Sequence, residues 1–75
     1  MTDTLRVFVN ADGVDVAAGA SALDAVRTWR SDEAEAVASG KRVITDSRGL
    51  PIDAATPARA GSIYRTVTSR PERDA

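Results

Sequence analysis

The chain has no cysteine and no histidine. Without cysteine, neither a disulfide framework nor a thiolate metal site can support a small core. Without histidine, the chain lacks the usual general base and the commonest metal ligand. It also has only one Phe, one Trp and one Tyr, and so few rings on which nucleic-acid bases stack. The hydroxyl groups of the chain also have no imidazole to activate them. From these absences together we expect no catalytic residues, no metal site and no cofactor.

Long apolar runs are absent as well. No stretch of about 18 residues is apolar enough to span a membrane, and the opening MTDTLRVFVN lacks the charged-then-apolar pattern of a signal peptide. We therefore expect a cytoplasmic protein with no membrane association. A chain of 75 residues makes one domain near the lower size limit for an unsupported core. We place that domain at 1–69 and a flexible polar tail at 70–75.

Charge is unevenly distributed along the chain. Residues 1–40 hold three arginines against seven acids, whereas residues 41–75 hold seven basic groups against four acids. A basic excess of this size is weak for nucleic acid. We interpret most of these charges as a mixed, solvated surface.

The first segment predicts a β-hairpin. In LRVFVN (5–10) every second residue is aliphatic, which is the period-two pattern of a half-buried strand. Asn10-Ala11-Asp12-Gly13 follows, and its Asp-Gly pair is a strong hairpin signal because glycine tolerates the positive φ of a tight turn. The alternation resumes in VDVA. The acids near this turn lack the spacing of a calcium loop.

A helix is predicted to start at Ser21. Asp24 follows three residues later, as in a capping box, although its side chain is shorter than the usual glutamate. Leu23, Val26 and Trp29 share an apolar stripe. We expect Trp29 to fix the helix to the sheet, with its indole N–H on a carbonyl or a water molecule.

A second, short helix is predicted from Ser31, as N-cap, to Gly40, as C-cap. Short strands are expected at 42–45 and 50–52, then a loop at 53–61 and a last strand at 62–68. The fold class is α+β: a mixed sheet of four to five strands, with one main helix on one face and a possible short second helix.

Several segments resemble the ubiquitin-like β-grasp superfamily. LRVFVN is similar to its opening strand. VDVAAGASALDAV is similar to a passage shared by two branches, the sulfur carriers of thiamine and molybdopterin synthesis and the TGS domains of synthetases and GTPases. PARAGSIYRTV resembles their entry to the last strand, with Ser62 in place of an acid. The likeness covers about residues 5–68 and implies a β-grasp fold whose first and last strands are neighbours.

Sulfur carriers and ubiquitin-type modifiers end in Gly-Gly, whose carboxylate is adenylated by an activating enzyme. This sequence contains no Gly-Gly, and Pro71 stiffens the exit from the last strand. A degenerate sulfur carrier is therefore an alternative rather than the leading hypothesis. A second alternative is a TGS-like module that contacts RNA. Its arginines would be Arg42, Arg48, Arg59, Arg65, Arg70 and Arg73.

The last strand has two possible phases. Turning Arg65 into a core this small without a partner costs several kcal/mol. We therefore prefer the phase with Tyr64 and Thr66 inward. In the alternative phase Ile63 and Val67 enter the core and Arg65 reaches the sheet edge.

The preferred phase predicts a partner-binding surface. Its residues are Phe8, Ile63, Arg65 and Val67, with Phe8 contributed by the neighbouring first strand. An exposed apolar group around an arginine has the composition of an interface hot spot, and ubiquitin-like domains bind partners through the corresponding face. The leading hypothesis is a non-catalytic interaction module with an unknown protein partner, as a monomer or weak homo-oligomer, and not a nucleic-acid binder.

Overall fold

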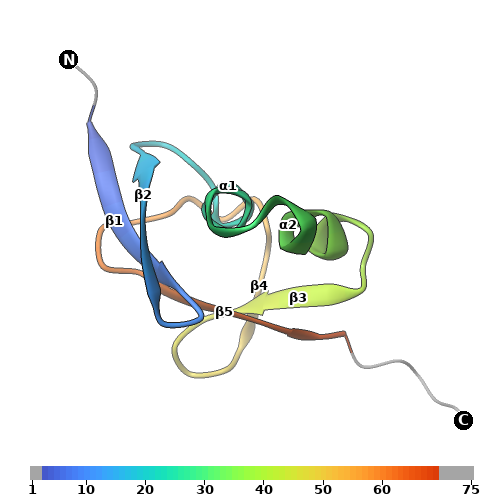
Figure 1. The fold of residues 1–75 in the computed structure, drawn as a ribbon. Helices are drawn as coiled ribbons and strands as arrows, with labels where there is room; N and C mark the ends of the chain where they lie inside the picture. The colour runs from blue at the N-terminus through green and yellow to red at the C-terminus, as the bar shows by residue number, and fades with distance from the viewer. Residues whose placement is uncertain (1–2, 70–75) are drawn as a thin grey trace, which may run out of the picture.

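The structure, a computed structural model, describes residues 3–69. Its elements are β1 (Thr4–Val9), β2 (Asp12–Ala17), α1 (Ala22–Trp29), α2 (Ser31–Ala38), β3 (Arg42–Thr45), β4 (Pro51–Ile52) and β5 (Ile63–Thr68). The sheet order is β2-β1-β5-β3-β4, in which β1 and β5 are parallel and the other neighbours antiparallel. Both helices lie on one face of the sheet (Figure 1). The expected α+β class with a mixed sheet is confirmed. The tail expected at 70–75 lies outside the described residues.

The hairpin turn lies within the predicted segment 10–13, but at its first two residues and not at the Asp12-Gly13 pair. Val9 pairs with Asp12, so Asn10 and Ala11 form a two-residue turn, and both have positive φ, 52° and 75°. This is the combination that type I′ hairpins require. Gly13 instead lies inside β2, where an added Cβ would come within 2.9 Å of a guanidinium nitrogen of Arg6. Because Gly13 has no side chain, the Arg6 side chain can lie over it.

Replacing Ala11 with glycine is expected to stabilise the protein by about 1 kcal/mol, because an L-residue with a side chain is strained in the left-handed region. Ala55→Gly is the matched control, since Ala55 is an exposed loop residue without positive φ. It should lower stability by a few tenths of a kcal/mol. Urea unfolding of the two variants provides the measurement, and equal destabilisation by both would contradict the turn assignment.

The start of α1 is fully capped. Ser21 Oγ accepts a hydrogen bond from the Asp24 N–H at 3.1 Å, and the Asp24 carboxylate accepts one from the Ser21 N–H at 3.0 Å. The predicted capping box is thus confirmed, despite the short aspartate side chain. The N–H groups of Ala22 and Leu23 donate to carbonyls of the 53–62 connection. Backbone donors that a helix leaves unpaired therefore tie α1 to a distant loop.

The start of α2 corrects a prediction. Ser31 is the first helical residue rather than the cap, and the N-cap is Arg30, which makes no side-chain capping bond. Asp32 Oδ1 accepts from the Glu33 N–H at 2.9 Å. At the other end, Gly40 has φ 88°, and the Gly40 and Lys41 N–H groups donate to carbonyls of the last helical turn. This is a Schellman ending, in which glycine supplies the left-handed residue, as expected of Gly40.

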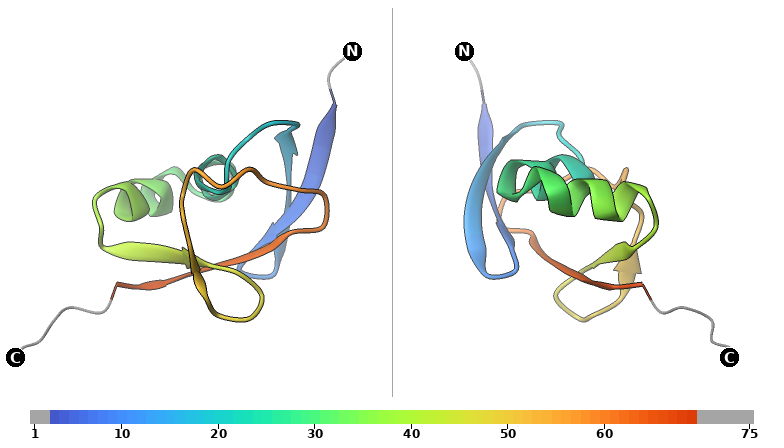
Figure 2. Two further views of the ribbon diagram at one scale, coloured as in Figure 1. Left: turned by 180° about the vertical axis from the view of Figure 1, so that it is seen from behind. Right: turned by 45° about the vertical axis from the view of Figure 1, so that its right-hand side comes forward.

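The core lies between the sheet and the two helices, which form one layer over it (Figure 2). Ala22 and Ala25 are fully buried, so α1 lies close to the strands beneath it. The sequence did not single out Ala34, which gives α2 its own buried contact. The core residues are Val7, Val9, Val16, Ala22, Ala25, Val26, Ala34, Ile44, Ala58 and Tyr64.

Candidate functional site

The last strand adopts the preferred phase. Tyr64 is 4% exposed and packs in the core, whereas Ile63 and Val67 are 45% and 42% exposed. Arg65 lies between them on the same face and is also exposed. This face of the sheet, opposite the helices, is called the outer face below. The chain exposes two aliphatic side chains here and keeps an arginine out of its core, in line with the cost of burying an unpaired charge.

The parallel pairing of β1 with β5 brings Phe8 into this group. Phe8 stands opposite Ile63 in the register and is 37% exposed. We refer to Phe8, Ile63, Arg65 and Val67 as the outer-face patch.

Three residues of the outer-face patch surround one shallow cavity of ≈ 570 Å³. Phe8, Ile63 and Arg65 contribute to its lining together with Asn10 and Ala11 of the hairpin turn. Val67 is not among the lining residues; it pairs with Val43 further along β5. The sequence missed Asn10 and Ala11, because only the β1–β5 pairing reveals that the turn borders the last strand.

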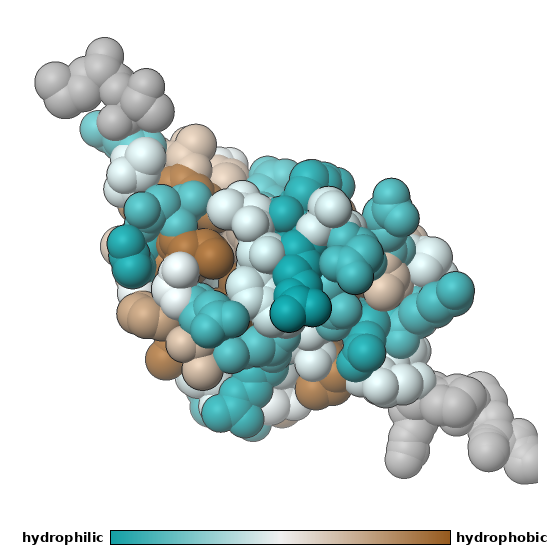
Figure 3. Space-filling view, in the orientation of Figure 1, coloured by the Kyte–Doolittle hydropathy of each residue, from teal (hydrophilic) through white to brown (hydrophobic). Residues whose placement is uncertain are grey.

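The two arginines on this face of β1 and β5 differ in their electrostatic environment. Arg6 Nε lies 3.0 Å from Asp15 Oδ1 of the adjacent strand β2. Among residues 3–69, no ion pair includes Arg65. Of these two arginines, Arg65 is therefore the uncompensated one, and it lies beside apolar side chains. In the view of Figure 3, by contrast, hydrophilic side chains cover most of the surface and the apolar areas are small.

A second, more polar depression of ≈ 300 Å³ adjoins the first at Ile63. Asp46, Arg48 and Ser62 are among its lining residues. The backbone N–H of Leu50, with that of Arg48, donates to Asp46 Oδ1. The Leu50 bond, the largest cause, lowers the pKa of Asp46 from its ordinary value; desolvation, the next in size, opposes it, and the Arg48 bond lowers the pKa further. Asp46 thus shapes the β3–β4 turn as a carboxylate.

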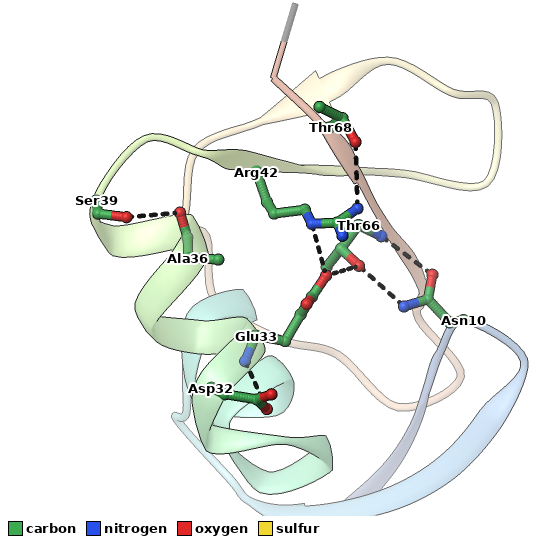
Figure 4. Close-up of polar contacts among 8 residues, drawn as sticks. All are labelled: Asn10, Asp32, Glu33, Ala36, Ser39, Arg42, Thr66 and Thr68. Atoms are coloured by element: carbon green, nitrogen blue, oxygen red, sulfur yellow. Dashed lines mark hydrogen bonds and ion pairs between the residues drawn. The ribbon is translucent and has the colours of Figure 1, made fainter.

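A polar network on the helix side joins α2, β3 and β5 to the hairpin turn (Figure 4). Thr66 Oγ1 donates to Glu33 Oε2 at 2.7 Å and accepts from Asn10 Nδ2 at 2.9 Å. Asn10 Oδ1 accepts from the Thr66 N–H at 3.1 Å. Arg42 Nε lies 3.4 Å from Glu33 Oε2, and Arg42 Nη1 donates to Thr68 Oγ1 at 3.3 Å. Each of these side chains has a partner within the network, and although Asn10 also lines the first cavity, Glu33, Arg42 and Thr66 line neither cavity. We assign this network to structure.

Trp29 fixes α1 to the hairpin, as predicted, but through a different acceptor. Its indole Nε1 donates to the Asp12 carboxylate at 2.8 Å rather than to a carbonyl or a water molecule. The Arg30 guanidinium lies 5.2 Å from the Trp29 ring centroid, within cation–π range. This explains why an acid follows the turn: Asp12 accepts the ring nitrogen of a residue on the helix above.

Across residues 3–69, no helix has the length and apolar character needed to cross a bilayer. The same residues contain no group of three potential metal-ligating side chains. No known protein family, curated protein or solved structure matches this chain.

Proposed function

We propose that this chain is a non-catalytic β-grasp module that binds a protein partner through the outer-face patch. The strand arrangement supports the β-grasp assignment: a hairpin leads into a helix that crosses the sheet, and the first and last strands lie side by side. The supporting observation for binding is the convergence of Phe8, Ile63 and Arg65 on one cavity of the helix-free face.

The composition of the outer-face patch favours binding over catalysis. Aromatic residues and arginine are enriched in protein interfaces relative to the rest of the surface. Removing partly exposed large apolar side chains from water at an interface stabilises the complex. The cavity contains neither a nucleophile beside a base nor a pair of carboxylates, the arrangements on which hydrolytic chemistry depends.

Phe8→Asp is expected to abolish partner binding while the protein still folds. Phe8 is more than a third exposed, so the change should cost about 1 kcal/mol of stability or less. Leu50→Asp is the matched control, because Leu50 is 54% exposed and lines neither cavity. Photo-crosslinking in cells that express the protein provides the measurement, with the reactive amino acid placed at Ile63 or, for comparison, at Arg30 in the helical layer.

The expected result is a crosslinked protein from position Ile63 but not from Arg30, lost in Phe8→Asp and kept in Leu50→Asp. Equal crosslinking from both positions, or none from Ile63, contradicts the proposed function. Loss of cooperative unfolding in Phe8→Asp also contradicts it, since Phe8 would then belong to the core.

A further inference from the structure

The cavity on the outer face combines two kinds of contact that one short segment can satisfy together. Phe8, Ala11 and Ile63 provide apolar walls, and Arg65 lies at the same cavity. Among residues 3–69 the Arg65 side chain has no carboxylate within ion-pair distance. A partner that covers it therefore desolvates a cation, which is costly unless the partner also supplies the counter-charge.

From this arrangement we propose the chemistry of the partner. The outer-face patch binds a short acidic segment of another protein: one large apolar side chain enters the cavity, and an adjacent Asp or Glu pairs with Arg65. This inference rests on the proposed function and adds the identity of the recognised groups. The planar guanidinium binds a carboxylate in bidentate fashion, which gives direction as well as affinity.

A second copy of the chain fits this face poorly. A symmetric dimer repeats the same patch on both sides, so it would bring two unpaired Arg65 side chains into one interface. The patch itself contains no acid, and the nearby Asp15 is already paired with Arg6. Like charges brought together in a desolvated contact are unfavourable. The occupant is therefore a different protein.

Nucleic acid is also disfavoured on this face. Phosphate binding draws on several cations, each of which releases counterions. Of the two arginines on this face of β1 and β5, Arg6 is neutralised by Asp15 and only Arg65 remains. One carboxylate can neutralise Arg65, whereas a phosphate backbone carries several charges that would each require a cation.

Selection from a phage-displayed library of random short peptides tests this inference on the full chain. Peptides enriched on the wild-type protein are synthesised with a fluorescent label, and their affinities are measured by polarisation. We expect each to contain a large apolar residue next to Asp or Glu. Phe8→Asp should weaken binding by roughly 30-fold or more, as expected for a central anchor.

Arg65→Glu should weaken the selected peptides by about tenfold or more. Arg30→Glu, a charge reversal in the helical layer, should change affinity by less than about twofold. Exchanging the peptide carboxylate for lysine should restore binding to Arg65→Glu, since the pair is then reversed. Restored affinity in this charge swap would show that the side chain at position 65 contacts the charged side chain of the peptide directly.

The outcomes separate this inference from the proposed function. If the selected peptides lose affinity in Phe8→Asp but contain no acid, or bind Arg65→Glu as tightly as the wild type, the acidic partner is excluded and the proposed function is retained. If no peptide is enriched, or if Phe8→Asp leaves the affinities unchanged, both proposals are wrong. Labelled single-stranded RNA that binds through Arg65, or concentration-dependent dimers abolished by Phe8→Asp, would also overturn the inference.

Discussion

Replacing Ile44 with alanine is expected to lower the free energy of unfolding by roughly 2–5 kcal/mol. Ile44 is 1% exposed and is among the largest fully buried side chains of the domain. It lies on β3 opposite Thr66 of β5 and Ile52 of β4, so its removal opens a cavity where three strands meet. A domain of this size rarely holds more than about 3–5 kcal/mol in its core. We therefore expect Ile44→Ala to be largely unfolded in water by circular dichroism.

Two controls define the expected contrast. Ile44→Val removes one methylene from the same position and should cost about 0.5–1.5 kcal/mol. Ile63→Ala truncates an isoleucine on the opposite, exposed face of β5 and should cost about 1 kcal/mol or less. An Ile63→Ala variant that unfolds as readily as Ile44→Ala would show that the outer-face patch is part of the core, contrary to the structure.

Asn10→Ala is expected to destabilise the protein by about 2–3 kcal/mol, the second-largest effect. Asn10 has positive φ, which alanine tolerates less well than asparagine. Its side chain also bonds both the Thr66 hydroxyl and the Thr66 backbone N–H. The Thr66 N–H lies beyond the last residue pair between β1 and β5. The Asn10 side chain there accepts the hydrogen bond that a longer β1 would otherwise accept.

Asn10→Gly separates the two contributions. Glycine accepts the positive φ but makes no side-chain bond, so about 1–2 kcal/mol of the loss should remain. Thr66→Val removes the hydroxyl that bonds Asn10 Nδ2 and keeps the backbone N–H bond, and the double variant should cost less than the two single losses together. Urea unfolding measures all three. If Asn10→Gly is as stable as the wild type, the Asn10–Thr66 bonds contribute nothing to stability.

Features set by neighbours in the sequence could be predicted from it. The Ser21–Asp24 capping box follows from two residues three positions apart. The phase of β5 follows from the cost of burying Arg65, a single strong constraint on a strand whose other residues fit either face. The strand at 5–10 and the helix from Ser21 were predicted close to their observed bounds for the same reason.

Features set by tertiary contacts could not be predicted. Asn10 and Thr66 are 56 residues apart, and nothing in either segment signals the other. The Asp12-Gly13 pair is a stronger local turn signal than Asn10-Ala11, but in the structure Gly13 lies in β2 against the Arg6 side chain and Asp12 accepts a hydrogen bond from the Trp29 indole. The sequence predicted an exposed binding surface that includes Phe8, Ile63 and Arg65, but not a cavity. Its remaining lining residues depend on how the turn meets β5.

The most direct measurement is a nitrogen–proton correlation spectrum of the labelled protein titrated with a peptide selected as above. We expect the largest shifts at the amides of Phe8, Ile63 and Arg65 and at the Arg65 side chain, with little change along α1 and α2. Shifts concentrated on the two helices, with the outer face unchanged, would contradict the account.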